Sequence, residues 1–379
     1  MREAYVIGVG MAPFGRFPDK SIVDHGVTAA TGALTDAGVT FPDVGFVACG
    51  ASSAGSIAGN RVVRELGPTG VEVISVDNAS ASGSSAFRQA VVAVQEGRTD
   101  IAMALGVGKL DRDRYRDPRV LAADSELLRN LVGTGRSSAA AMFALFARRR
   151  MHDRGTDPSV FARITVKDHL HASMNPNACF RNLLTVEEAM GAKVISDPIR
   201  LYDCTPTCDG GAAAIVASED VARRLARHPL VAVRGSVAIS DLDLRPIYDH
   251  VHLTEVASQR LYESTGIGPA DLDLVQVHDA FSSEELDYYE PLGVCPPGDA
   301  EKLVMEGATQ LGGRIPFSTD GGLVSRGHPL GPTGLAQIWE TTLQLRHQAG
   351  ARQVENARTG LVHMMGNGDV CIVHMLQRA

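Results

Sequence analysis

The sequence lacks the features that identify nucleic-acid-binding, membrane-spanning and nucleotide-binding proteins. It has no run of basic residues and a formal net charge of -8, which argues against nucleic acid as a partner. No apolar stretch approaches the roughly 20 residues that a helix needs to span a bilayer. The chain has neither a Gly-x-x-x-x-Gly-Lys phosphate loop nor a nicotinamide-binding fingerprint. We therefore expect a soluble protein without nucleic-acid or membrane partners.

Cysteine is sparse, and its placement argues against a metal site. Of the six cysteines, only Cys204 and Cys208 lie close together, and no second pair or histidine cluster occurs at zinc-binding spacing. The pair His169-x-His171 is a weaker candidate, because residues two apart on a helix do not face each other. We expect Cys204 and Cys208 to lie in a packed loop and His169 and His171 to be solvated or to cap a helix. We expect no bound metal.

The two ends of the chain and its cysteines favour the cytoplasm. Met1 to Gly10 resembles a first strand and a glycine turn rather than a cleavable signal. Leu376 to Ala379 does not form a peroxisomal address. The scattered cysteines are expected to be reduced thiols, which fits the same compartment.

The strongest large-scale pattern is an internal repeat with an offset of 228 residues. Tyr5 to Val9 corresponds to Val233 to Val237, and each of these strands is followed by a helix, a turn and another strand. A length of 379 residues with 39 glycines suits two core units or one duplicated unit. We predict an α/β fold with two similar halves, residues 1–232 and 233–379, and an insertion in the first half at about residues 109–209.

A turn between a strand and a helix presents one hydroxyl group, that of Ser80. Val71 to Val76 alternates like a strand, and Ser84 to Gln95 is an Ala- and Val-rich helix that Gly97 ends. The small residues of the turn let another group approach the backbone, and the first amides of the helix carry a partial positive charge. Such a turn suits a nucleophile that attacks a carbonyl. A Gly- and Ser-rich turn without chemistry is the alternative interpretation.

Two distant histidines also lie at the ends of regular elements. His328 precedes Pro329 in a glycine-rich turn that leads into a helix over Leu335 to Arg346, and His278 follows a short buried strand. The flanking glycines let a substrate and the loop come close, which a merely packed histidine does not need. Two histidines in such surroundings indicate a site that they share with Ser80.

These segments together resemble the thiolase superfamily, and most closely the thiolases of the sterol carrier protein and lipid-transfer protein type. The resemblance covers nearly the whole chain. It implies a duplicated thiolase fold, with mixed sheets, helices between the two α/β halves and a loop domain that covers the substrate. The motifs that carry the resemblance are Asn78–Gly83, Asn175–Arg181, Asp197–Pro198, Leu201–Ala212, His278–Phe281, Gly321–Gly322, Gly327–Pro329 and His363–Gly368.

The resemblance also implies a chemistry for each site residue. It implies coenzyme A thioesters as substrates and no permanently bound cofactor. Ser80, at the position of the family's nucleophilic cysteine, attacks the thioester carbonyl, while His328 accepts or positions the proton. His278 is the electrostatic partner, and the backbone amides of Ser80 and Gly366 stabilise the oxyanion. His363 lines the pocket or belongs to the packed core.

The chain departs from the family at both of the family's cysteine positions. Ser80 replaces the nucleophile, and a serine hydroxyl needs a base in contact because it stays un-ionised near neutral pH. The second cysteine, a proton donor and acceptor, corresponds to Met364 or to Ala280, and neither of these side chains carries a proton. An engineered Cys-to-Ser change, a natural serine acyltransferase and a divergent enzyme are the three explanations.

We predict an acyl-CoA acyltransferase that cleaves or forms a carbon-carbon bond in a 3-oxoacyl-CoA through an acyl-enzyme. One alternative is a retro-aldolase that acts on a CoA thioester without a covalent intermediate, with Tyr288 or Tyr289 as acid or base. The other is a non-catalytic carrier of acyl-CoA or lipid. By the resemblance, the partners are acyl-CoA and CoA, a second copy in a homodimer, and a small subunit with a zinc ribbon and an OB fold.

Overall fold

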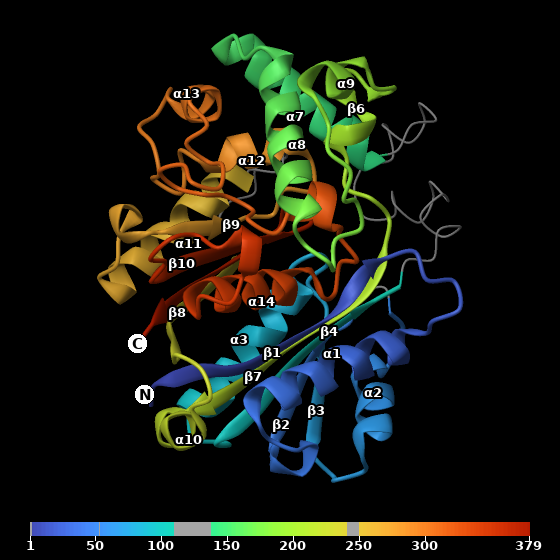
Figure 1. Cartoon of the computed structure of the whole chain (residues 1–379), viewed down its shortest axis with the longest axis vertical. Helices are drawn as coiled ribbons and strands as arrows, with labels where there is room; N and C mark the ends of the chain where they lie inside the picture. Colours follow the sequence, from blue (N-terminus) through green and yellow to red (C-terminus); the bar gives the residue numbers. More distant parts are fainter. Residues whose placement is uncertain (1, 53, 110–137, 241–249) are drawn as a thin grey trace.

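The computed structural model describes residues 2–52, 54–109, 138–240 and 250–379. Within these residues a nine-stranded mixed sheet runs through the molecule in the order β3-β2-β4-β7-β1-β8-β11-β10-β9, with helices around it (Figure 1). Its strands are β1 (Ala4–Gly15), β2 (Phe46–Gly50), β3 (Glu72–Val76), β4 (Ile101–Gly108), β7 (Asp209–Ser218), β8 (Val231–Ser240), β9 (Leu274–Gln276), β10 (Thr359–Gly366) and β11 (Val370–Arg378). The helices are α1 (Ile22–Ala37), α2 (Ala58–Leu66), α3 (Ser82–Gln95), α7 (Ser138–Arg154), α8 (Pro158–Ser173), α9 (Val186–Gly191), α10 (Glu219–Leu225), α11 (His250–Thr265), α12 (Ser282–Tyr288), α13 (Ala300–Met305) and α14 (Thr333–Leu345).

The two halves of the chain repeat the same strand pairing on either side of the centre of the sheet. β1 pairs antiparallel with β7, β7 pairs antiparallel with β4, and β4 runs parallel to β2. In the second half β8 pairs with β11, β11 with β10 and β10 with β9 in the same three orientations. β1 and β8 join the halves, with Tyr5 opposite Ala232 and Val6 opposite Val231. The duplicated α/β fold is confirmed, and its two half-sheets form one continuous sheet.

The local sequence explains where these elements begin and end. All residues of β4 and β7 are buried, in agreement with their unbroken runs of apolar and small residues. α1 begins at a capping box in which Ser21 and Asp24 satisfy each other's backbone amides, and it ends at Gly38 in the left-handed conformation, with φ 70°. The burial of these strands and the ends of this helix therefore agree with the apolar runs and the capping residues in the sequence.

Helices α3 and α14, one from each half, meet at their first turns. A Cβ atom on Gly334 would lie 2.3 Å from Ser84 Oγ, and one on Gly83 would lie 2.6 Å from the carbonyl oxygen of Gly331. Side-chain carbons do not approach other atoms so closely, so this contact requires glycine at both positions. Apolar residues of both halves also share one core around the two helices. The contact brings the turn before α3 next to the turn before α14.

The described part of the predicted insertion packs on the second half of the chain (Figure 1). α8 contacts α12, α13 and the π-helical turn Gly322–Arg326. Arg150 of α7 is nearly buried and forms ion pairs with Asp287 at 2.8 Å and Glu301 at 2.9 Å. Residues 110–137 of the predicted insertion lie outside the described residues. None of the described helices combines the length and the apolar character that a membrane span requires.

The prediction that His169 and His171 are solvated or cap a helix is wrong. Both side chains are buried in α8. The Nδ1 atom of His171 donates to the carbonyl oxygen of Ser318 at 3.1 Å, and its Nε2 atom accepts from the backbone of Leu311 at 3.1 Å. Burial lowers the pKa of His171 to about 3, so the ring is neutral. The spacing of the two histidines could not show their burial, because residues distant in sequence cover them. Asn182 and Tyr202 contact His169, and the second half of the chain contacts His171.

We predict that the protein loses stability as the pH falls below 6.5, and that the variant His171→Gln loses less. Between its folded pKa of about 3 and its unfolded value of 6.5, the His171 ring binds fewer protons in the folded chain, so the stability it supports is complete above 6.5 and falls with pH. At pH 5 this residue accounts for about 2 kcal/mol of the loss. Urea unfolding at pH 7.5 and pH 5 measures the difference. The control His152→Gln, at an exposed ring, should keep the wild-type pH dependence, and the same dependence in His171→Gln would contradict the account.

Candidate active site

Ser80 lies in the sharp turn between β3 and α3. Ala79 adopts the left-handed conformation, with φ 49°. The backbone of Ala79 donates to Asp77 Oδ1 at 3.0 Å, and the backbone of Asn78 donates to Ser82 Oγ at 2.9 Å. Since α3 begins at Ser82, the Ser80 side chain lies just before the positive end of the helix dipole. It is 9% exposed, so its hydroxyl is largely removed from water.

The structure brings His328 into contact with this hydroxyl. His328 Nε2 lies 2.9 Å from Ser80 Oγ, although the two residues are 248 positions apart in the sequence. The other ring nitrogen, Nδ1, lies 2.8 Å from Thr333 Oγ1 in the first turn of α14. His328 can take the serine proton only when its own proton is on Nδ1, and there the oxygen of Thr333 accepts it. Thr333 therefore supplies an acceptor for the tautomer in which Nε2 is free to take a proton.

The surroundings of His328 keep its ring neutral. Burial lowers the pKa of His328 well below its usual value, and electrostatic interactions with His278 and Arg326 lower it further. A neutral imidazole keeps a lone pair on Nε2, which can accept a proton, over the whole neutral pH range. The Ser80 and His328 pair thus has the geometry of a hydroxyl in direct contact with a neutral imidazole.

His278 stands on the other side of His328. It follows β9, and its ring centre is 5.3 Å from that of His328 in an edge-to-face arrangement. Its Nδ1 atom lies 3.0 Å from Glu284 Oε1 of α12. Its Nε2 atom is buried and has no hydrogen-bond partner in the described part of the chain. A buried imidazole nitrogen without a partner among the described residues therefore lies close to His328.

Gly366 packs directly against the serine turn. A Cβ atom at this position would lie 2.3 Å from the carbonyl oxygen of Asn78, so only glycine lets the end of β10 come so close. Met364 packs under the same turn, in a small apolar cluster with Ala81. Ala280 is also buried. Neither Met364 nor Ala280, the two positions that the resemblance pairs with the family's second cysteine, carries a titratable group.

His363 lies behind the site. It is fully buried, accepts a hydrogen bond from the backbone of His278 at 3.5 Å, and has its Nε2 atom 2.9 Å from Thr254 Oγ1. This placement favours the interpretation of His363 as a packed residue that supports His278. Tyr288 and Tyr289 are also fully buried, and their hydroxyls bond to Glu284 and Glu285.

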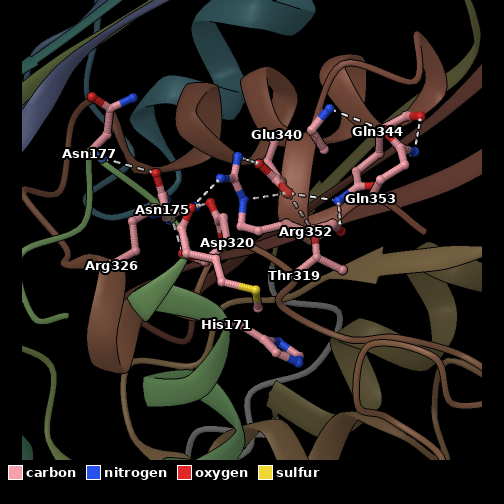
Figure 2. A network of polar contacts seen from close by, with 12 residues as sticks. His171, Asn175, Asn177, Thr319, Asp320, Arg326, Glu340, Gln344, Arg352 and Gln353 are labelled. Carbon is pink, nitrogen blue, oxygen red and sulfur yellow. Dashed lines mark hydrogen bonds and ion pairs between the residues drawn. The ribbon is translucent and has the colours of Figure 1, made fainter. Parts of the chain in front are cut away.

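A buried polar network anchors the loop that carries His328 (Figure 2). Arg326 forms an ion pair with Asp320, and both side chains are fully buried. Asn175 donates to the backbone of Asp320 at 3.0 Å from the end of α8. Farther along, Glu340 of α14 accepts from Arg352 at 2.8 Å. These contacts fix the loop from behind, because a buried ion pair keeps its geometry only while both partners stay in place.

Sequence reasoning missed Thr333 and Glu284. Each contacts a histidine that the sequence did single out, and each lies five or six residues after it in the chain. The sequence evidence that could have pointed to them is their position at the start of a helix. Hydroxyl and acidic side chains are common there for capping reasons alone. Only the folded arrangement distinguishes a residue that orients a histidine from one that caps a helix.

The fold and the site together define an α/β protein of duplicated halves with a buried serine and histidine pair suited to acyl transfer. Comparison with known proteins agrees. The family model described as "Thiolase, N-terminal domain" matches residues 4–220, and "Thiolase C-terminal domain-like" matches residues 238–374. The chain belongs to the thiolase superfamily, in its sterol carrier protein type, as the sequence motifs had indicated.

Three relatives match over nearly the whole chain. An acetyl-CoA acetyltransferase of Methanothermobacter thermautotrophicus is 35% identical over 100% of both chains. Human sterol carrier protein 2 is 34% identical over 98% of this chain and 71% of its own length. The benzoylsuccinyl-CoA thiolase subunit BbsB of Thauera aromatica is 34% identical over 97% of this chain and 95% of its own. The names acetyl-CoA acetyltransferase and benzoylsuccinyl-CoA thiolase support an acyltransferase at the level of the family.

A solved structure with a different reaction in its name is also similar. The structure called Ltp2-ChsH2(DUF35) aldolase has a TM-score of 0.85 and 26% identity, and the match covers 99% of this chain and 98% of that one. The fold of this chain is therefore compatible with two kinds of carbon-carbon chemistry.

We predict that phenylmethylsulfonyl fluoride modifies Ser80 and that Thr333→Val slows this modification about tenfold. Losing the acceptor on Nδ1 removes one hydrogen bond, worth about 1.4 kcal/mol, from the tautomer that activates the serine. Mass spectrometry of the intact protein over time gives the rate, and peptide mapping gives the position. The control Thr28→Val changes a threonine of α1 whose hydroxyl bonds only to its own helix, and it should react at the wild-type rate. An equal rate in Thr333→Val would show that Thr333 does not orient His328.

Proposed function

We propose that this chain is a thiolase-like acyl-CoA acyltransferase that cleaves or forms a carbon-carbon bond in a 3-oxoacyl-CoA through an acyl-enzyme on Ser80. The observation that carries the proposal is the 2.9 Å contact between Ser80 Oγ and His328 Nε2 just before α3. A serine needs a base in contact to attack a thioester, and this site supplies one. Ser80 then takes the place of the family's cysteine.

In the cleavage direction, Ser80 Oγ attacks the 3-oxo carbon and its proton passes to His328 Nε2. The developing oxyanion receives hydrogen bonds from the backbone amides of Ser80 and Gly366. His278 supplies a further polar contact, for the oxygen of the thioester. Removing one oxyanion donor in such sites costs about 10²- to 10³-fold in rate. The chain itself supplies these groups, and coenzyme A acts as a substrate.

The assembly that we propose consists of two chains and a small partner. Residues 1–232 and 233–379 form the two halves of each chain, and a second copy completes a homodimer in the cytoplasm. One relative is named as a subunit, and the aldolase structure carries two protein names. These names support a partner subunit of this chain, and we propose that it is small and contains a zinc ribbon and an OB fold.

A CoA-thioester retro-aldolase is the second candidate. The observation that favours it is the apolar character of Met364 and Ala280, because cleaving a 3-hydroxyacyl-CoA needs a base and an enolate pocket but no second cysteine. The similarity to the aldolase structure supports it too. In this reaction Ser80 forms no covalent bond.

We predict that incubation with a 3-oxoacyl-CoA adds one acyl group to Ser80, and that Ser80→Ala lowers CoA-dependent cleavage by about 10³-fold or more. Intact-protein mass spectrometry after rapid acid quenching detects the adduct, and loss of the 3-oxoacyl-CoA absorbance measures cleavage. Ser264→Ala, at a serine of α11 that bonds only to its own helix, is the control. An unmodified mass, together with cleavage of a 3-hydroxyacyl-CoA by Ser80→Ala, would reject the acyltransferase in favour of the aldolase.

A further inference from the structure

A buried carboxylate holds His278 from behind, and the steps described above make no use of it. Glu284 of α12 is 2% exposed. Its Oε1 atom is 3.0 Å from His278 Nδ1 and also accepts from the hydroxyl of Tyr288, and its Oε2 atom accepts from the backbone of Ala280 at 3.1 Å. A carboxylate with three such contacts acts as an acceptor in each of them. The proton between Glu284 and His278 therefore lies on Nδ1.

Because Glu284 binds Nδ1 of His278, the other ring nitrogen, Nε2, is the one that can act in the site. With Nδ1 bound to Glu284, Nε2 is the nitrogen that gains or loses a proton, and it is the buried atom without a partner. The titratable groups around the ring are Glu284 of α12, His328 of the opposite turn, His363 of β10 and the neighbouring Asp279. A buried nitrogen without a partner is costly, and such atoms persist mainly where a ligand completes them.

The reaction needs a proton carrier beyond His328. Breaking the bond between C2 and C3 leaves an electron pair on C2 that must receive a proton, and His328 holds the proton of Ser80 at that moment. Met364 and Ala280 are apolar. Among the described side chains, His278 combines an unpartnered titratable atom with a ring contact to His328.

We propose that His278 Nε2 exchanges a proton with the α-carbon of the CoA thioester, and that Glu284 and Tyr288 are positioning residues that orient His278 for this step. The inference rests on the proposed function and adds the second acid-base group to it. Tyr288 acts through Glu284, because its hydroxyl fixes the carboxylate that fixes the ring. His278, oriented by Glu284, thus carries out the proton transfer for which the family uses its second cysteine.

The steps balance in the cleavage direction. Ser80 Oγ bonds to C3, its proton moves to His328, and the C2–C3 bond breaks with its electrons on C2. Protonated His278 gives its Nε2 proton to C2 and releases the shortened acyl-CoA. The thiol of an incoming CoA returns a proton to His278 as its sulfur bonds to the acyl carbon. The bond from that carbon to Oγ breaks, and Oγ recovers its proton from His328.

Exchange of α-hydrogens with solvent isolates the proposed step from acylation. We predict that the protein incorporates deuterium from D₂O at C2 of acetyl-CoA or propionyl-CoA, measured by mass spectrometry of the recovered thioester. Glu284→Gln should lower the exchange rate by about 10- to 100-fold. Tyr288→Phe keeps the ring and removes only the hydroxyl, and should lower it by about fivefold. The rate at which phenylmethylsulfonyl fluoride modifies Ser80 should fall less than about threefold in either variant.

The control is Glu290→Gln, which removes a carboxylate that pairs with Arg154 outside the site and should exchange at the wild-type rate. Equal losses of exchange and of Ser80 modification would show a merely structural role for Glu284 and overturn the proposal. Unchanged exchange in both variants, or no exchange by the wild type, would also overturn it. Exchange that depends on Glu284 in a protein whose Ser80 is never acylated would instead reject the proposed acyltransferase and keep this assignment.

Discussion

The contact between the first turns of α3 and α14 is the constraint on which the site depends. Gly83 and Gly334 let the two turns approach to a distance at which any Cβ atom would overlap a neighbour. One turn carries Ser80 and the other carries His328, so neither half of the chain contains a base and a nucleophile in contact. The duplication of the fold therefore has a chemical consequence, because two copies of one unit supply two different groups to a shared site.

Burial gives this pair its chemical character. A dry environment keeps His328 neutral and makes its contact with Ser80 stronger than it would be in water. The same environment makes unsatisfied polar atoms costly, and the protein answers with buried contacts behind each histidine. Asp320 and Arg326 hold the loop of His328, while Glu284 holds the ring of His278. The polar network around the site thus maintains its geometry and leaves one imidazole nitrogen for the substrate.

Much of this arrangement followed from local sequence patterns, since a strand, a small-residue turn and a helix leave clear signals. The turns of Ser80 and His328 and the division of the chain into two similar α/β halves were predictable in this way. The hydrogen bonds to Thr333 and Glu284 were not, because helix starts favour such residues for capping alone. The burial of His171 was missed for a related reason: the periodicity of a helix tells which residues share a face, and only the tertiary structure tells what covers it.

The most direct test of the central claim is a crystal structure of the protein after brief exposure to a 3-oxoacyl-CoA. The account predicts a covalent bond from Ser80 Oγ to the acyl carbon, with the acyl oxygen within hydrogen-bonding distance of the backbone amides of Ser80 and Gly366 and the His328 ring beside Oγ. A bound thioester whose carbonyl lies away from Ser80, with the serine still hydrogen bonded to His328 and unmodified, would contradict it.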